Sequence, residues 1–410
     1  MRVSKTVVAV LLFSGCAIAG EALGGELAPG RYKRIACKGN ASWTYDLFIP
    51  AAYAAEPKRK FPVLLTSGPG GYPRFMKMED WAERRGVIIV AINNTKNKME
   101  WEEVDPVQAD VIASVEATVR VHPCLRFSMG MSGGACCSMH LAGKRNDKHA
   151  GILMLGHSGN GQDRHLEKHI SVAFVHGEND KVHSPGAVRS VAKALESRGN
   201  PVRRISGDWG HEWGPHEFHV QCLDWMLDLQ RLVHPKLPPE EKRAGAEELV
   251  RRAEGLAKIQ GPAERLREAD MLLELPEALT RKNSKDIYSG WFSASFELAK
   301  AKDDTVAKHA ALTDLSENAR IARCASTDRR ELSKLLRELR RKSPAKEEWA
   351  ARRLLSRIEF MEKKAGKSRS KKRQAAQSYA MIAKKYPDTA AGRAAGEAAK
   401  RLAADLSEGR

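Results

Sequence analysis

The first 235 residues alternate between short apolar runs and stretches in which apolar residues recur at helical spacing. The apolar runs are expected to form strands over residues 60–66, 87–92, 125–129, 152–155 and 172–175. The stretches between them are expected to form helices over residues 108–119, 135–144 and 185–197. Strands that alternate with helices predict an α/β domain with a mostly parallel sheet and helices on both faces.

Three prolines, Pro235, Pro238 and Pro239, end this pattern. Beyond them the chain is rich in alanine, leucine, glutamate, lysine and arginine, and no segment favours a strand. Helical spacing recurs over residues 247–259, 332–339 and 349–361. We therefore expect an α/β domain over residues 30–235 and an all-α C-terminal region over residues 240–410.

Residues 374–402 place the turn Tyr386-Pro387-Asp388-Thr389 between two helical stretches. This arrangement resembles one helical hairpin of the tetratricopeptide type. Such repeats bury a core only when about three units stack. A single copy therefore implies packing or docking and not chemistry.

The N-terminus has the pattern of an export signal. The basic residues Arg2 and Lys5 precede an apolar run over residues 7–13. Ala17 and Ala19 follow it and fit the small-residue pattern of a cleavage site. This predicts that residues 1–19 are a signal peptide and that the protein is exported to the periplasm, the cell envelope or the extracellular space. A second interpretation is a lipoprotein signal, in which Cys16 becomes the lipidated first residue.

Six further cysteines follow the signal segment, and an oxidising compartment would allow some of them to pair. They are Cys37, Cys124, Cys136, Cys137, Cys222 and Cys324. They are expected to be buried small hydrophobic residues or to form one or two bridges, whose pairing the sequence leaves open.

Positive charge is concentrated in the C-terminal region. The whole chain has a formal net charge of +18, and the segment from Lys363 to Arg373 contains seven basic residues and no acidic one. One interpretation is a solvated linker between helices. The other is binding to an anionic polymer or a membrane surface. Nucleic acid is disfavoured as a partner, because no aromatic residues are interleaved with these charges.

Gly130-Met131-Ser132-Gly133-Gly134 has the G-x-S-x-G pattern, with a predicted strand directly before it and a predicted helix directly after it. A serine at such a turn is strained and exposes its hydroxyl. Ser132 is therefore the predicted nucleophile, and the amide of Gly133 is a predicted oxyanion donor. Ser158 lies in a similar segment, but Asn160 replaces the last glycine and no helical pattern follows.

A nucleophilic serine needs a base, and the base needs an orienting acid. In hydrolases with this turn, the acid and then the histidine follow the serine along the chain. Asp180 follows the predicted strand 172–175, and His211 follows the apolar Ile205. Both are expected at the carboxyl edge of the sheet, where such folds place their sites. Asp180 is the predicted acid and His211 the predicted base.

Nearby residues leave alternatives for both roles. Glu178 or Asp208 could replace the acid, and His216 or His219 could replace the base. A metal site at these histidines is disfavoured, because the spacing is not that of two ligands on one helical face and Pro215 would interrupt the helix. The spacing therefore predicts no metal site at these histidines.

Four motifs in this order resemble the polyhydroxybutyrate depolymerase and feruloyl esterase group of α/β hydrolases. They are Val121-His122-Pro123 with Arg126, the serine turn, His176-Gly177 with Asp180, and Gly210-His211-Glu212-Trp213. They lie within residues 61–229. The resemblance implies the α/β-hydrolase fold and hydrolysis of carboxylic esters through an acyl-enzyme, with no metal and no organic cofactor.

The chain departs from that group after its first predicted strand. The group has His-Gly and further small residues there, which supply a second oxyanion donor, whereas this chain has Ser67-Gly68-Pro69-Gly70-Gly71. Pro69 has no amide hydrogen. Gly70, or else Gly71, would have to donate instead.

Together these features predict an exported serine esterase. Too few residues separate Gly156 from Asp180 for a large cap domain, and an open site suits an ester on a polymer or a polysaccharide. The alternative is an envelope binding protein with weak or no catalysis, which uses a hydrolase-fold domain and a helical docking region. The departure at Pro69 motivates this alternative.

Overall fold

The computed structural model describes residues 27–73, 75–275, 284–302, 305–341, 345–365 and 368–408. It divides the chain into two compact units, Met1–Leu249 and Val250–Arg410. The predicted signal peptide and Cys16 lie outside the described residues. None of the described helices combines the length and the apolar character that a membrane crossing requires.

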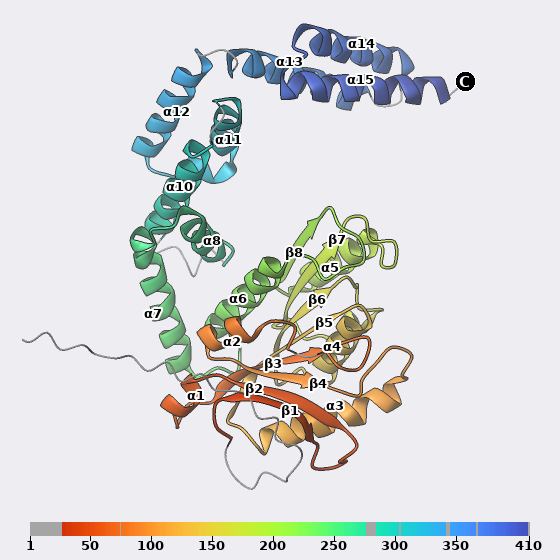
Figure 1. Ribbon diagram of the computed structural model, residues 1–410, viewed down its shortest axis with the longest axis vertical. Helices are drawn as coiled ribbons and strands as arrows, with labels where there is room; N and C mark the ends of the chain where they lie inside the picture. Colours follow the sequence, from red (N-terminus) through yellow and green to blue (C-terminus); the bar gives the residue numbers. More distant parts are fainter. Residues whose placement is uncertain are drawn as a thin grey trace, which may run out of the picture. The chain divides into compact units, whose positions relative to one another are not determined.

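The first unit is built on an eight-stranded sheet (Figure 1). Its strands are β1 (Gly30–Ala36), β2 (Thr44–Ile49), β3 (Phe61–Ser67), β4 (Ile88–Ile92), β5 (Val121–Met131), β6 (His149–Leu155), β7 (Ser171–Gly177) and β8 (Val202–Gly207). They are ordered β1-β2-β4-β3-β5-β6-β7-β8. β2 is antiparallel to both its neighbours, and every other pairing is parallel. The prediction of a mostly parallel sheet is confirmed.

All five predicted strands are present, and three strands lie outside those runs. β3, β6 and β7 are buried along their whole length, which explains their continuous apolar sequences. β1 is at the edge of the sheet, and most of its side chains are exposed or half-buried. The sequence of such an edge strand shows only a weak hydrophobic pattern, which is why the sequence did not predict β1.

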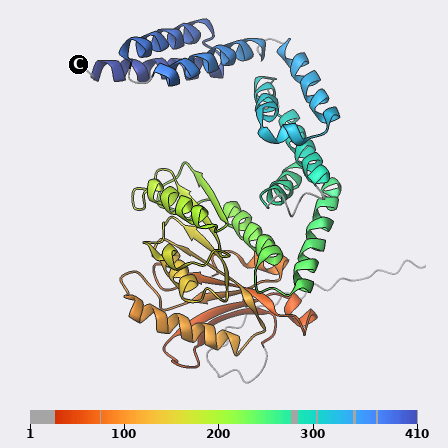
Figure 2. The same ribbon diagram turned by 180° about the vertical axis from the view of Figure 1, so that it is seen from behind.

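Helices cover both faces of this sheet (Figure 1 and Figure 2). The helices of this unit are α1 (Ala52–Ala55), α2 (Glu79–Arg85), α3 (Trp101–Glu116), α4 (Gly133–Lys144), α5 (Pro185–Arg198) and α6 (His216–Val233). The next helix, α7 (Pro239–Gly255), contains the boundary between the two units. α3, α4 and α5 pack on one face through two apolar clusters. α2 and α6 are joined by a hydrogen bond of 2.9 Å from Trp81 Nε1 to Asp224 Oδ1.

The helix predicted at residues 108–119 begins earlier, at Trp101. Glu100 and Glu103 form a capping box, in which each side chain accepts a hydrogen bond from the backbone of the other residue. Pro106 lies inside the helix, in its second turn. The cap therefore sets where this helix starts, and Pro106 does not.

The structure forms no disulfide among the six cysteines of the described residues, and all six are buried. Burial raises the pKa of Cys136 to about 11 and that of Cys137 to about 12. Thiols with such pKa values stay protonated and unreactive near neutral pH. The six cysteines therefore act as small hydrophobic residues.

Three buried histidines of the first unit predict a loss of stability in acid. Burial lowers the pKa of His149 to about 3, and that of His157 and His234 to about 4. Below the usual histidine pKa of about 6.5, these histidines bind protons in the unfolded chain but stay neutral in the folded chain. The free energy of unfolding should therefore fall as the pH drops from 6.5 towards 4, by up to about 1.4 kcal/mol per pH unit for each histidine.

Urea unfolding at a series of pH values measures this effect. The variant His149→Gln should show a shallower decline, whereas the exposed His165 offers a matched control, His165→Gln, that should leave the slope unchanged. An equal slope in wild type and His149→Gln would contradict the assignment to His149.

The described residues of the second unit form helices joined by turns, and none of them is in a strand. Its α-helices are α8 (Pro262–Leu273), α10 (Ser284–Lys300), α11 (Thr305–Glu317), α12 (Ser326–Arg340), α13 (Ala345–Ala365), α14 (Arg369–Lys385) and α15 (Ala390–Glu408). The prediction of an all-α C-terminal region is confirmed. α14 and α15 form a hairpin around the predicted turn, and Tyr379 and Ala395 belong to its core with α13.

The basic segment from Lys363 to Arg373 is mostly helical, so the interpretation as a linker holds only in part. Lys363 and Lys364 lie in the last turn of α13, and α14 begins at Arg369. Lys367 is outside the described residues.

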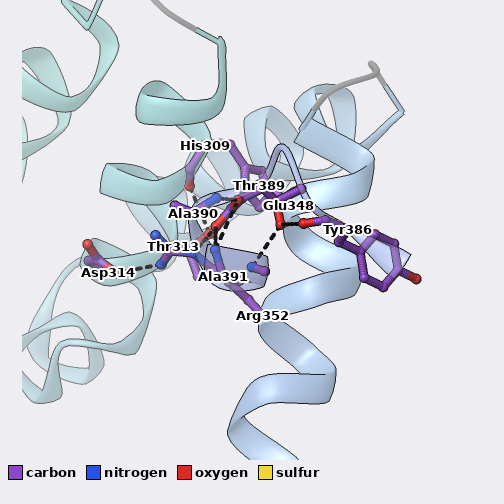
Figure 3. Close-up of polar contacts among 10 residues, drawn as sticks. His309, Thr313, Asp314, Glu348, Arg352, Tyr386, Thr389, Ala390 and Ala391 are labelled. Carbon is purple, nitrogen blue, oxygen red and sulfur yellow. Dashed lines mark hydrogen bonds and ion pairs between the residues drawn. The ribbon is translucent and has the colours of Figure 1, made fainter. Parts of the chain in front are cut away.

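A buried glutamate joins α13 to the N-terminus of α15 (Figure 3). Glu348 is fully buried, and its Oε2 accepts a hydrogen bond of 2.7 Å from the amide of Ala390. Its Oε1 accepts from the amide of Ala391 at 3.3 Å and from Arg352 Nε at 3.0 Å. The carboxylate thus accepts hydrogen bonds from amides that have no partner within α15. It also lies at the N-terminus of α15, which is the positive end of the helix dipole.

Replacing Glu348 by alanine should destabilise the second unit by about 2–4 kcal/mol, because buried amides lose their acceptor and Arg352 loses its partner. Urea unfolding followed by circular dichroism measures the loss. The adjacent Glu347 is exposed, and Glu347→Ala should change the free energy of unfolding by no more than about 0.5 kcal/mol. Similar losses in both variants would show that the cap is not the cause.

Candidate active site

Ser132 sits at the sharp turn between β5 and α4. Its backbone has φ 53° and ψ −125°, a conformation that non-glycine residues rarely adopt. The amide of Ser132 donates to the carbonyl of Leu155 on β6 at 2.9 Å, and its carbonyl accepts from the amide of Ala135 at 2.9 Å. These bonds hold the strained turn and fix the serine at the carboxyl edge of the sheet.

The flanking glycines are required because the backbone is crowded there. A Cβ on Gly130 would lie 2.3 Å from the carbonyl carbon of Gly134, and one on Gly134 would lie 2.3 Å from the carbonyl oxygen of Ser67. Both distances are far below van der Waals contact. The glycine pattern around Ser132 is thus a requirement of packing between β3, β5 and α4.

The structure brings Ser132, His211 and Asp180 into one hydrogen-bonded chain. His211 Nε2 lies 3.1 Å from Ser132 Oγ, and His211 Nδ1 lies 2.8 Å from Asp180 Oδ2. Asp180 follows β7, and His211 lies on the loop between β8 and α6. Such an arrangement can deprotonate the serine hydroxyl and stabilise the resulting imidazolium.

Backbone amides hold the carboxylate of Asp180 in place. Its Oδ1 accepts from the amides of Val182 at 2.8 Å and His183 at 2.9 Å. Burial would raise the pKa of Asp180, but these hydrogen bonds and the one with His211 lower it below its usual value. Asp180 is therefore ionised at neutral pH and orients His211.

Two further histidines lie beside His211. The ring of His183 is 5.3 Å from that of His211 and 4.0 Å from that of His157, measured between ring centroids. Burial lowers the pKa of both His157 and His183, and the charge of His211 adds to this effect. Both are thus neutral near pH 7, and His183 packs against His211 while His157 packs against His183.

The alternative acids are engaged elsewhere. Glu178 Oε2 accepts from Arg189 at 2.8 Å, and Asp208 Oδ1 accepts from Asn179 Nδ2 at 2.5 Å.

The alternative bases lie in the first turn of α6. His219 Nε2 hydrogen-bonds to the carbonyl of Trp213 at 2.6 Å, and His216 packs edge-on against His219. Ser158 lies on the loop after β6 and not at a strand-to-helix turn. Within the described residues, no group of three or more histidine, cysteine, aspartate or glutamate side chains is placed to hold a metal ion.

The two predicted oxyanion donors lie on adjoining segments. Gly133 is the first residue of α4, where backbone amides have no partner within the helix. The loop after β3 packs against it, since a Cβ on Gly134 would lie 2.8 Å from the Cα of Gly68. The amide of Gly71 donates to the carbonyl of Gly68 at 3.3 Å. Of the two amides considered after Pro69, that of Gly70 is therefore the better placed to bind a ligand.

Asn97, which the sequence did not single out, lies directly over Gly133. A Cβ on Gly133 would lie 1.8 Å from Asn97 Oδ1 and 3.6 Å from Asn97 Nδ2. The amide of Asn97 also donates to the carbonyl of Pro69 at 2.9 Å. Asn97 therefore ties the loop after β4 to the loop that carries Gly70 and brings a side-chain amide to the predicted oxyanion donors. No motif marks it, because its role depends on which loops meet.

No protein-family model matches the chain, and no curated protein sequence matches it. Several solved structures are similar to it. A ferulic acid esterase is 16% identical, with 44% of this chain and 89% of that chain covered and a TM-score of 0.36. A carboxylesterase of Bacillus cereus is 15% identical, with 46% and 95% covered and a TM-score of 0.37. The fluorophosphonate-binding serine hydrolase F of Staphylococcus aureus is 14% identical, with 45% and 92% covered and a TM-score of 0.38.

The topology of the first unit is itself diagnostic. A mostly parallel sheet with helices on both faces carries a G-x-S-x-G turn after β5, and an aspartate and a histidine follow the serine at the same edge of the sheet. The first unit of this chain therefore has the α/β-hydrolase fold.

Proposed function

We propose that this protein is a serine hydrolase that cleaves carboxylic esters through an acyl-enzyme. The hydrogen-bonded chain from Ser132 through His211 to Asp180 is the observation that carries the proposal. A decayed site would be expected to lose one of these side chains or their geometry. The amides of Gly133 and Gly70 serve as oxyanion donors.

The reaction then proceeds in two halves. Ser132 Oγ attacks the ester carbonyl carbon while His211 Nε2 takes the hydroxyl proton, and the carbonyl oxygen becomes an oxyanion. The tetrahedral intermediate collapses, the bond to the alcohol oxygen breaks, and His211 returns its proton to that oxygen. His211 then deprotonates a water molecule, which attacks the acyl carbon. The bond from that carbon to Ser132 Oγ breaks, His211 returns the proton to Oγ, and the carboxylic acid is released.

The direct test is hydrolysis of short p-nitrophenyl esters together with labelling by a fluorophosphonate probe. We expect saturable ester turnover and a single labelled peptide that contains Ser132, identified by mass spectrometry. Turnover should stop in proportion to labelling. Labelling at another serine, or stoichiometric labelling without loss of turnover, would overturn the proposal. A protein that hydrolyses no ester and takes up no probe would favour the alternative of a binding protein.

Asn97 is proposed to add a donor where Pro69 has none. The side-chain amide of Asn97 lies against Gly133, with Oδ1 as its nearest atom and Nδ2 next to it. The two ends of an amide are nearly isosteric, so the proposed role requires the N–H end to turn towards the oxyanion. Replacing Asn97 by alanine should lower kcat about 10²-fold with little change in KM, as expected for a donor that acts in the transition state. The control is Lys96→Ala, which removes an exposed neighbouring side chain and should leave kcat unchanged. A change confined to KM would contradict the role of Asn97.

Export is proposed from the segment that ends at Ala19. Mass spectrometry of the mature protein would distinguish cleavage after Ala19 from a lipidated N-terminus at Cys16. A full-length, cytoplasmic protein would refute both forms of export.

The basic segment from Lys363 to Arg373 is proposed to bind an anionic polymer or membrane surface. Its described side chains are almost all exposed, and basic residues in the first turn of α14 add to the positive end of the helix dipole. Co-sedimentation of the full chain with anionic vesicles, compared with neutral ones, tests this. Binding should decrease with salt and with the variant Lys371→Gln/Lys372→Gln. Equal binding to neutral vesicles would rule it out.

A further inference from the structure

A groove with a volume of about 990 Å³ lies in the first unit. We call it the basic groove and define it by six of its lining residues, Arg31, Lys33, Arg34, Lys77, Tyr72 and Trp213. Residues from β1, from the loop after β3 and from the segment before α6 line it together.

Two residues that line the basic groove are close in sequence to the proposed site residues. Trp213 is two residues from His211, and Tyr72 is two residues from Gly70. Two residues of chain span at most about 7 Å. The loop that carries Tyr72 is also packed on the turn of Ser132, through Gly68. A substrate with its ester at Ser132 can therefore extend into the groove.

Positive charge dominates the groove. The described lining residues include four basic and two acidic side chains. Glu79 is paired with Arg31 at 3.2 Å, and Asp46 Oδ1 accepts from the amide of Arg34 at 2.9 Å. Within the described residues, Lys33 and Lys77 form no ion pair. Their charges are available to an anionic ligand.

Two aromatic side chains add flat, exposed surfaces. Tyr72 is 59% exposed and Trp213 is 42% exposed, although both line the groove. The guanidinium of Arg34 lies over the ring of Tyr72, 5.8 Å from its centroid. His219 hydrogen-bonds to the carbonyl of Trp213 and fixes the end of the loop between β8 and α6. Large aromatic side chains exposed in a hollow indicate a ligand-binding surface.

We propose that the basic groove binds a sugar ring that carries a carboxylate, next to the ester that is cleaved. The apolar face of the ring stacks on Tyr72 or Trp213, while the carboxylate pairs with Lys33 and Lys77. A neutral sugar would use the aromatic surfaces alone, and a simple carboxylate would use the lysines alone. The groove therefore selects an acidic saccharide over both. Assigning this ligand to the substrate rests on the proposed ester hydrolase activity.

Calorimetric titration of the full chain tests the groove without catalysis. The Ser132→Ala variant would be titrated with trigalacturonate and with galactotriose, which has similar rings without carboxylates. Trigalacturonate should bind about tenfold more tightly at low salt, and this advantage should shrink as salt screens the lysines. Adding Lys33→Gln and Lys77→Gln should remove the advantage and leave galactotriose binding as it was.

Matched controls separate the groove from other positive surfaces. Lys168 and Lys193 are exposed lysines of the same unit outside the groove, and the double change Lys168→Gln/Lys193→Gln should have no effect. Trp213→Ala should weaken both sugars alike. Equal affinity for the two trisaccharides would overturn the proposal. So would a loss of trigalacturonate binding on neutralising Lys371 and Lys372 but not Lys33 and Lys77.

Turnover distinguishes this inference from the proposed function. With the serine intact, kcat/KM for acetylated trigalacturonate should exceed that for acetylated galactotriose, and Lys33→Gln/Lys77→Gln should equalise the two. If neither ester nor p-nitrophenyl acetate is hydrolysed but trigalacturonate still binds, the esterase proposal fails and the binding site stands. If p-nitrophenyl acetate is hydrolysed and the acidic sugar has no advantage, only the groove proposal fails.

Discussion

Replacing Ser132 by alanine is expected to lower kcat for p-nitrophenyl acetate about 10⁶-fold, the scale seen when the nucleophile of a serine hydrolase is removed. His211 and Asp180 would keep their contact, but no group would attack the ester carbonyl. Only the uncatalysed action of water near the oxyanion donors would be left. Ser132 already has a positive φ, so alanine adds no new backbone strain at this position. The fold should therefore be retained, which circular dichroism can verify.

The matched control for this change is Ser158→Ala. Ser158 lies in a similar glycine-rich segment close to the site, since a Cβ on Gly156 would lie 3.5 Å from His211 Cε1. Its loss should change kcat by less than about tenfold, because His211 Nε2 is hydrogen-bonded to Ser132 Oγ and, in the described part of the chain, no histidine is hydrogen-bonded to the Ser158 hydroxyl. If Ser158→Ala abolished turnover and Ser132→Ala did not, the nucleophile would be misassigned.

Replacing Asp180 by asparagine is expected to lower kcat about 10⁴-fold without disturbing the fold. The amide would keep the size of the carboxylate and could still accept from the amides of Val182 and His183. Its NH₂ group would face His211 Nδ1, so that His211 would hold its proton on Nε2. A histidine in that tautomer cannot accept the proton of Ser132.

The controls for Asp180 are the two alternative acids. Glu178→Gln and Asp208→Asn remove carboxylates whose partners are Arg189 and Asn179, and each should leave kcat within about threefold, as for other surface changes. The lowered pKa of Asp180 keeps its carboxylate ionised well below neutral pH. Protonation of Asp180 should therefore not reduce wild-type turnover in that range. A large effect of Asp208→Asn and a small one of Asp180→Asn would move the acid to Asp208.

Sequence alone identified the hydrolase-fold core because its signals are local. A buried central strand such as β3 is apolar along its length, and the turn at Ser132 needs glycines wherever backbone approaches backbone. Chain order was enough to favour Asp180 and His211, since parallel strands deliver their following loops to one edge of the sheet. The alternative acids and bases could not be separated from them, because loops of a few residues can place any of these side chains at that edge.

The rest was decided by contacts between distant segments. Asn97 meets Gly133 only because the loop after β4 folds over the start of α4. The basic groove is lined by Lys33 and Trp213, which are far apart in the sequence. In the second unit, Glu348 on α13 caps the N-terminus of α15. None of these residues has a distinctive sequence neighbourhood. Hydrophobic periodicity and turn-forming residues depend on neighbours along the chain, so the sequence alone reveals them. The contacts of a loop side chain depend on how distant segments pack, which only the tertiary structure determines.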